Sequence, residues 1–186
     1  MNILHLLTTA AGVALLTVGL ALPAAAQSAK AQLKDASGKD VGTVDLTQTQ
    51  AGVLLKMNVK GLPAGDHAFH VHAVGKCEPP FDSAGGHFNP NNNKHGFMAG
   101  GHAGDMPNLH IPASGELAVD VLNPAVTLEK GKANSVFDTD GSAIIIHVNA
   151  DDYQTDPTGN AGGRIACGIV SEGGATPAGA PARQTG

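Results

Sequence analysis

The sequence has no tryptophan and a single tyrosine, and aromatic residues make up only 3% of its 186 residues. A core without large aromatic anchors has to close on valine, isoleucine, leucine and alanine. Charged residues are also scarce, at 15%, and the formal net charge of −5 gives no support for a general nucleic-acid-binding protein. No segment after residue 26 has the spacing of an amphipathic helix, which disfavours a helical bundle.

No charged residue precedes Lys30, and residues 3–22 form an apolar run followed by "PAAAQ". The small residues there are typical of a signal-peptidase site. We therefore predict that residues 1–26 are a signal peptide, cleaved near Ala26, which leaves a periplasmic or secreted protein with no stable membrane association. A permanent membrane anchor is the alternative, since the run is long enough to span a bilayer.

Only two cysteines are present, Cys77 and Cys167, and neither lies near the predicted cleavage site, so a lipid anchor has no attachment residue. In an oxidising compartment two cysteines most simply form one disulfide. Two unrelated buried thiols are the other possibility.

Polar and apolar residues alternate along several short segments, as strands with one buried face require. These segments cover residues 31–35, 41–50, 53–62, 68–74, 115–122, 142–150 and 164–170. About seven or eight such strands predict an all-β antiparallel sandwich or barrel. Residues 74–114 are dense in Gly, Pro, Asn and His without periodicity, and residues 150–163 ("ADDYQTDPTGNAGG") also read as a loop, so we predict two long functional loops there.

One domain fits the length between the signal peptide and the C-terminus. We assign it to residues 27–171. Residues 172–186 are of low complexity ("EGGATPAGAPARQTG") and are predicted to be a disordered tail.

Histidine is the residue type that this sequence concentrates. His70 and His72 stand two apart in a predicted strand, so both side chains leave the same face. His147 lies in an apolar strand, and His87, His95 and His102 lie in the first long loop. Buried neutral imidazoles need partners and clustered imidazolium ions repel, so the group indicates metal binding.

The donor types suggest two different metals. Four imidazoles without a thiolate suit copper, and three imidazoles with one aspartate suit zinc. His70, His72 and His147 lack a fourth copper ligand, and His95, His102 and Asp105 lack a fourth zinc ligand. His87 can complete both sets if its two ring nitrogens bind different ions.

The chain resembles the copper/zinc superoxide dismutases, and in particular their secreted bacterial members. The resemblance covers residues 61–170 through the ordered motifs "GDHAFHVH", "GGHFNP", "KHG", "GHAGD", "IIIHVNADD" and "GNAGGRIACG". It implies an eight-stranded antiparallel Greek-key β-barrel or sandwich. It also implies the conversion of two superoxide anions and two protons to O2 and H2O2 by alternating Cu(II) and Cu(I), as antioxidant defence outside the cytoplasm.

The resemblance further implies one copper and one zinc per chain and assigns residues to them. Copper would bind His70, His72, His87 and His147, and zinc would bind His87, His95, His102 and Asp105. His67 would brace the copper strands, and Asp151 would link a copper ligand to a zinc ligand. Arg164 would attract superoxide beside the copper, and His87 would carry a proton during turnover.

Cys77 and Cys167 match the family's intrasubunit disulfide, whereas His110 matches no ligand position and is expected to be a surface or structural residue. The segment from His95 to His102 is slightly short for the family. The loop between His147 and Arg164 contains no Lys or Arg.

Other functions remain open at this point. A copper-binding or storage protein on the same fold would share the ligands but would not need Arg164 or Asp151. A copper-only relative would not need the zinc ligands, and a purely structural domain would need neither set. Family members occur as monomers and as homodimers.

Overall fold

The computed structural model describes residues 27–97 and 100–173. The predicted signal peptide lies outside these residues, as does the predicted tail from residue 174 onward. Within the described residues, no helix is both long and apolar enough to cross a membrane. The last strand runs to Glu172, one residue beyond the predicted end of the domain.

The described part of the chain is built from strands and one short 3-10 helix, η1 (Asp82–Ala84). The strands are β1 (Ser28–Lys34), β2 (Asp40–Thr49), β3 (Gly52–Val59), β4 (Gly65–His67), β5 (Phe69–His72), β6 (Leu109–Ile111), β7 (Leu117–Asn123), β8 (Ala143–His147) and β9 (Arg164–Glu172). All strand pairings within the sheets are antiparallel, which confirms the predicted all-β class.

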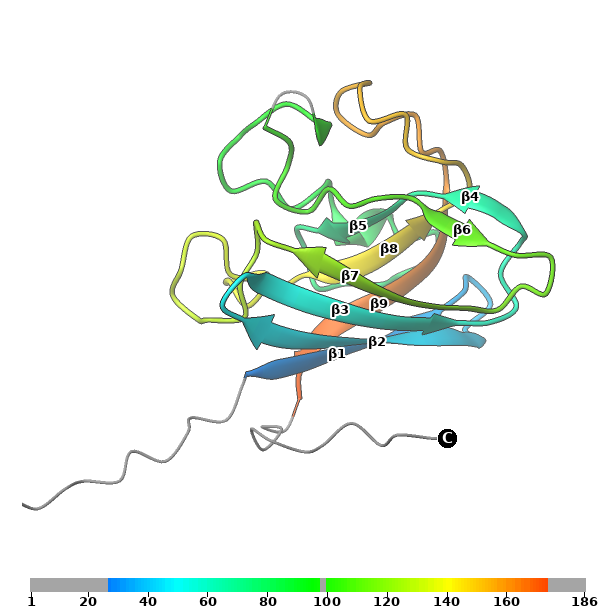
Figure 1. Ribbon diagram of the computed structural model, residues 1–186, viewed down its shortest axis with the longest axis horizontal. Helices are drawn as coiled ribbons and strands as arrows, with labels where there is room; N and C mark the ends of the chain where they lie inside the picture. The colour runs from blue at the N-terminus through cyan, green and yellow to red at the C-terminus, as the bar shows by residue number, and fades with distance from the viewer. Residues whose placement is uncertain (1–26, 98–99, 174–186) are drawn as a thin grey trace, which may run out of the picture.

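Seven strands form one curled sheet in the order β5-β8-β9-β1-β2-β3-β7, and β4 and β6 form a second, two-stranded sheet. The chain crosses from β3 to β5 and back from β7 to β8, between opposite ends of this order, as Greek-key connections do (Figure 1). The strands number nine because β4 and β5 are one run interrupted at Ala68. Counted as one, they give the predicted eight.

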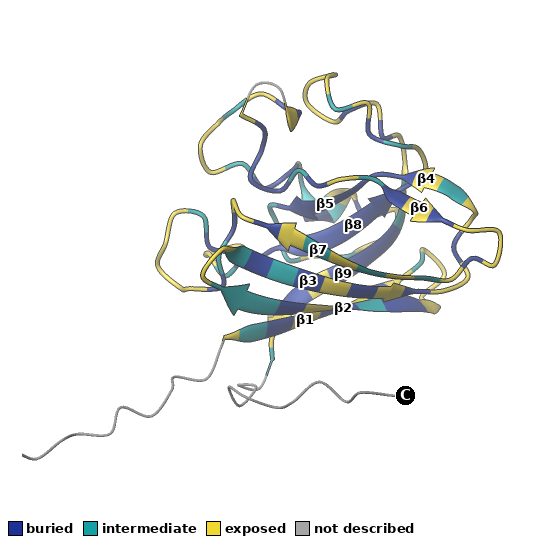
Figure 2. Cartoon of the chain, viewed as in Figure 1, coloured by how far each residue is buried: buried dark blue, intermediate teal, exposed yellow. Residues whose placement is uncertain are grey.

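The interior is filled mainly by aliphatic side chains, as the scarcity of aromatic residues predicts. β1 and β3 alternate buried and exposed residues, so each gives one face to the core. β5 and β8 are buried along their whole length (Figure 2). Polar imidazoles in these two strands are therefore removed from water.

The prediction that residues 74–114 lack regular structure is wrong at two places. η1 lies within this segment, and β6 pairs with β4 through Gly65↔Ile111 and His67↔Leu109. Each element has only three residues, too few for a periodic pattern to reveal. In Figure 1 the green part of this segment that precedes β6 and the loop of residues 150–163 lie on the same side of the sheet.

Candidate metal centre

The central strands and the first long loop bring the predicted ligands to one place. β5 pairs with β8, so His70 and His72 lie beside the strand that ends at His147. The loop folds back onto β5 through isolated bridges, His72 with His87 and His70 with Asp105. Hydrogen bonding of the loop backbone to β5 thus positions residues that lie 15 to 35 positions away in the sequence.

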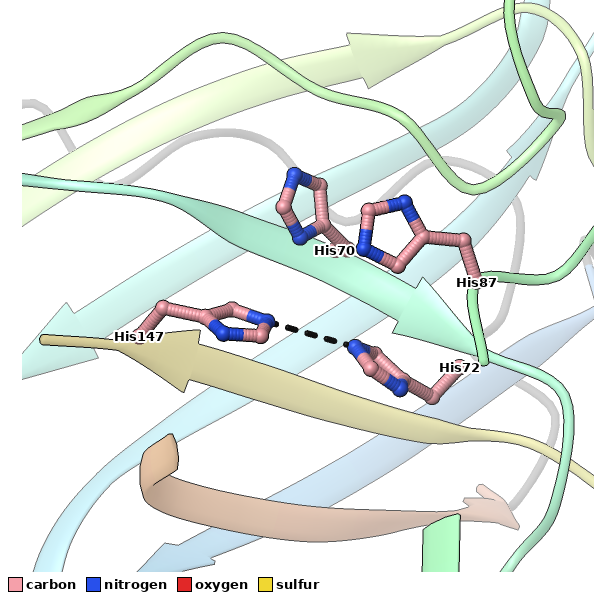
Figure 3. Close-up of side chains that lie close together, drawn as sticks. All are labelled: His70, His72, His87 and His147. Atoms are coloured by element: carbon pink, nitrogen blue, oxygen red, sulfur yellow. Dashed lines mark hydrogen bonds between the residues drawn. The ribbon is translucent and has the colours of Figure 1, made fainter. Parts of the chain in front are cut away.

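Four buried histidines form a first group, His70, His72, His87 and His147. One ring nitrogen from each lies within 4.8 Å of the others. Figure 3 shows the four rings around a common centre, with the Nε2 atoms of His72 and His147 3.3 Å apart. This is the set predicted to bind copper.

Two nitrogens in this first group, His70 Nδ1 and His87 Nε2, are buried and have no hydrogen-bond partner within the described residues. An unpaired buried polar atom is costly, so native structures rarely retain one without a bound water or ion. A cation held by these nitrogens would supply the missing partner. Imidazole donors without a thiolate fit copper, so the residues present suit that ion.

His87, His95, His102 and Asp105 form a second buried group. Asp105 Oδ1 lies 2.8 Å from His87 Nδ1, 3.1 Å from His95 Nδ1 and 3.4 Å from His102 Nδ1. A tetrahedral zinc site with bonds of about 2.0–2.1 Å has ligand atoms about 3.3 Å apart. The second group therefore fits zinc.

His87 belongs to both groups because its two ring nitrogens face different ways. Nδ1 lies 2.8 Å from Asp105 Oδ1 in the second group and 3.3 Å from His102 Nδ1. Nε2 is one of the two unpaired nitrogens of the first group. The ring thus lies between the two candidate ion positions.

Asp151 connects the two groups from outside. Its Oδ2 lies 2.8 Å from His70 Nε2, and its Oδ1 lies 2.9 Å from His95 Nε2. Asn108 fixes this carboxylate's backbone: Asp151 N donates to Asn108 Oδ1 at 2.8 Å, and Asn108 Nδ2 donates to Asp151 O at 2.9 Å. A carboxylate at the outer nitrogen of a ligand histidine fixes the ring and turns the other nitrogen inward.

Burial favours the neutral form of three histidines of the first group, His70, His72 and His147. It lowers the pKa of His70 to about 4 and that of His147 to about 3, and it lowers the pKa of His72 well below the usual value. The repulsion of neighbouring imidazoles, His87 among them, acts in the same direction. Neutral imidazoles are the form that binds a metal ion.

The second group contains a carboxylate that stays ionised. Burial raises the pKa of Asp105, but hydrogen bonds from His87 and from the Gly96 and His102 N–H groups outweigh burial and hold this pKa well below the usual range. Asp105 Oδ2 accepts from those two N–H groups at 3.1 and 2.9 Å. The negative charge is thus preorganised on the zinc side.

Arg164 begins β9 beside the first group. Its guanidinium donates to the carbonyl oxygens of Phe81 at 2.5 Å and Gly85 at 2.6 Å. Burial lowers the pKa of Arg164, but a guanidinium remains charged at any physiological pH. Three residues further on, Cys167 forms the predicted disulfide with Cys77, with Cα atoms 5.7 Å apart.

Two other histidines of the described residues, His67 and His110, lie outside both groups. His67 is buried, with Nδ1 2.8 Å from the carbonyl oxygen of His147 and Nε2 3.1 Å from that of Pro63. His110 is exposed, and its Nδ1 lies 2.5 Å from Asp66 Oδ1.

Sequence reasoning missed Asn108, which fixes the backbone of Asp151, because no local pattern marks a contact with a residue 43 positions away.

An all-β domain in which two ligand groups share one histidine defines a candidate two-metal protein. The chain belongs to the copper/zinc superoxide dismutase family, since the model of that family matches residues 41–170. This confirms the resemblance in the sequence.

Three similar proteins illustrate the relationship. Superoxide dismutase [Cu-Zn] 1 of Aquifex aeolicus is 52% identical over 144 residues, which cover 75% of this chain and 85% of that protein. The crystal structure of a SOD-like protein from Bacillus subtilis is 41% identical, with a TM-score of 0.72, and covers 75% of this chain and 96% of its own. Cu/Zn superoxide dismutase from Brucella abortus is 30% identical, with a TM-score of 0.65, and covers 77% and 99%.

Proposed function

We propose that this protein is a superoxide dismutase that converts two superoxide anions and two protons to O2 and H2O2. One observation carries the proposal: His87 stands between a buried group of four histidines and a buried group of three histidines and one aspartate. Its family membership supports the same reaction.

The proposed copper ligands are His70, His72, His87 and His147, and the proposed zinc ligands are His87, His95, His102 and Asp105. Bound copper would supply one-electron redox chemistry, accepting an electron from one superoxide and passing it to a second. Bound zinc would supply a fixed positive charge that holds His87 Nδ1 and tunes the basicity of the ring.

The protein's own residues have two tasks in this reaction. His87 Nε2, which is buried and unpaired among the described residues, is placed to take up a proton and release it to the reduced substrate. Arg164 holds a positive charge close to His72, since both donate to the carbonyl oxygen of Gly85. A fixed guanidinium attracts a small anion and orients it through its N–H donors.

A copper-binding protein without turnover is the second candidate. It would need the four histidines, but not a charged arginine locked by two carbonyl oxygens at 2.5 and 2.6 Å. The arginine therefore favours the enzyme.

The experiment is metal analysis of the purified mature protein, combined with a superoxide dismutation assay before and after chelation. We expect one copper and one zinc per chain, activity lost on chelation, and activity restored by adding both metals. Full copper binding without dismutation would reject the enzyme and favour the second candidate.

We also propose that the protein works in the periplasm or is secreted after cleavage near Ala26. The Cys77–Cys167 disulfide supports an oxidising compartment, because the cytosol keeps most thiols reduced. N-terminal sequencing of the protein from a periplasmic or culture fraction tests this, and an uncut N-terminus in a membrane fraction would contradict it.

A further inference from the structure

The turn formed by residues 151–156 contacts His95 twice, once through Asp151 and once through Asp156. The outer ring nitrogen of His95 lies 2.9 Å from Asp151 Oδ1. Its backbone N–H donates to Asp156 Oδ1 at 2.7 Å, across 61 positions of sequence. Both the ring and the backbone of this proposed zinc ligand are therefore fixed by the same turn.

The same oxygen of Asp156 also faces a second member of the group. His102 Nε2 lies 3.9 Å from Asp156 Oδ1. This separation is too long for a hydrogen bond, so the interaction is one of charge. Because His102 Nδ1 points to Asp105, the nitrogen that faces Asp156 is the one that keeps its proton when a metal is bound.

The contact between Asp156 and His95 is part of a closely packed interface between two loop segments. Gly96 packs so tightly on the turn that a Cβ atom there would lie 2.1 Å from the carbonyl oxygen of Tyr153. The ring of Phe97 stacks on that of Tyr153, with centroids 4.9 Å apart. Residues 95–97 therefore lie directly against residues 153–156, and Asp156 is at one end of this contact.

Asp156 differs from Asp151 in how far its side chain is buried and in which ligand group it contacts. The side chain of Asp151 is fully buried and contacts one histidine of each group. The side chain of Asp156 is 49% exposed, and its contacts to the metal-binding groups go to His95 and His102, which belong to the zinc side alone. A change at Asp156 should therefore act on one metal and spare the other.

We propose that Asp156 is a positioning residue of the zinc site, which fixes the backbone of His95 and complements the charge of His102 when zinc is bound. The inference rests on the proposed zinc ligand set. Outer carboxylates of this kind orient ligand histidines and raise their basicity, and their loss lowers metal affinity by about 10- to 100-fold.

The test compares zinc binding by metal-free protein with Asp156, Asp156→Ala and Asp156→Asn, measured by competition with a chromophoric chelator. The alanine variant loses both contacts, so we expect its zinc affinity to fall by about 10- to 100-fold. The asparagine variant keeps an oxygen that can accept from His95 N–H and loses only the charge, so a smaller fall is expected. Copper affinity should stay unchanged in both.

Asp152→Asn is the matched control. Asp152 lies in the same turn, and its hydrogen bonds go to Gln154, Thr155 and Asn160. The control removes the same charge without touching either ligand group, so we expect zinc affinity like that of the unaltered protein. A second readout is the visible spectrum of Co(II) bound in place of zinc, which reports ligand geometry and should shift in Asp156→Ala only.

The outcomes separate this inference from the ligand assignment. If the unaltered protein binds no zinc, or if His102→Ala leaves zinc binding intact, the proposed ligand set fails. If the unaltered protein binds zinc and Asp156→Ala matches it in affinity and Co(II) spectrum, the role of Asp156 is rejected. An equal loss of copper and zinc affinity in Asp156→Ala would also reject it, in favour of a general effect on the loop.

Discussion

Arg164 and His72 donate hydrogen bonds to the same carbonyl oxygen, that of Gly85. The Arg164 guanidinium lies 2.6 Å from this oxygen and His72 Nδ1 lies 2.9 Å from it. Gly85 has a φ of +73°, in the region that favours glycine, and a Cβ atom there would approach Val74 at 3.2 Å. One backbone carbonyl thus fixes both the proposed anion-binding group and a proposed copper ligand.

The first prediction concerns the guanidinium itself. Arg164→Ala should lower kcat/KM for superoxide by about 10- to 100-fold, because the charge that attracts the anion is lost. Copper content should stay close to one per chain, since no proposed ligand is changed. Activity is measured by superoxide dismutation and copper by atomic absorption on the same sample.

Arg164→Lys is the control for charge. It keeps a cation but cannot donate to Phe81 and Gly85 in the geometry of a guanidinium, so we expect an intermediate kcat/KM. Full activity in Arg164→Ala would contradict the proposed role. Loss of copper in the same variant would show that Gly85 and His72 depend on the arginine for their position.

The second prediction concerns the carboxylate that joins the two groups. Asp151→Ala should weaken both copper and zinc binding by about 10- to 100-fold, because His70 and His95 each lose the partner of an outer nitrogen. Isothermal titration of the metal-free protein with each ion measures this. Asp66→Ala, at an exposed carboxylate in β4, is the control and should bind both ions normally.

Weakened binding of one ion alone in Asp151→Ala would contradict this prediction. It would mean that the bond to the other histidine does not orient its ring. Asp156 contacts only histidines of the zinc side. Comparing the two variants therefore separates an effect on both metals, expected for Asp151→Ala, from an effect on zinc alone, expected for Asp156→Ala.

The strands that carry His70, His72 and His147 could be predicted from sequence because their periodicity and apolar neighbours are local signals. β6 could not be predicted, because three residues are too few to show a periodic pattern and its pairing with β4 joins positions 42 to 46 apart. The long loop was recognised by composition, but its path over β5 depends on backbone bridges such as His72↔His87.

The two ligand groups could be anticipated because donor chemistry restricts the combinations. Imidazoles alone suit one ion and imidazoles with a carboxylate suit another, and His87 can complete both sets if it is shared. The supporting contacts of Asn108 and Asp156 could not be anticipated, because Asn and Asp are common loop residues and their partners lie 43 and 61 positions away.

The third prediction concerns pH and the metal-free protein. The pKa values of His70 and His147 are lowered to about 4 and about 3, so the unfolded chain takes up protons from about pH 6.5 downward while the folded chain does not. The folded state should therefore lose stability as pH falls, by about 1.4 kcal/mol per pH unit for each histidine.

Denaturant unfolding of the metal-free protein at pH 8, 7, 6 and 5 measures this dependence. We expect little change between pH 8 and 7 and a growing loss of unfolding free energy below pH 6.5. A free energy of unfolding that is constant from pH 7 to 5 would contradict the buried neutral state.

The fourth prediction concerns the disulfide. Cys77 and Cys167 are 90 positions apart, and closing a loop of this length stabilises the folded state by about 4–5 kcal/mol in the chain-entropy model, with measured values usually lower. Replacing both cysteines by serine should therefore lower the free energy of unfolding by about 2–4 kcal/mol. Denaturant unfolding at pH 7 measures it, and a change below about 0.5 kcal/mol would contradict it, being the size of an ordinary surface substitution.

The fifth prediction concerns the approach of superoxide. The loop of residues 148–163 contains Asp151, Asp152 and Asp156 but no basic residue, so the attraction rests mainly on the partly buried guanidinium of Arg164. Salt screens exposed charges beyond a Debye length of about 10 Å at 0.1 M but affects a partly buried charge at short range much less. We therefore expect kcat/KM to fall by about 2-fold or less between about 0.02 and 0.2 M salt, measured by pulse radiolysis at constant pH. A tenfold fall over the same range would show that distant surface charges, such as those of Lys76 and Lys94, guide the anion instead.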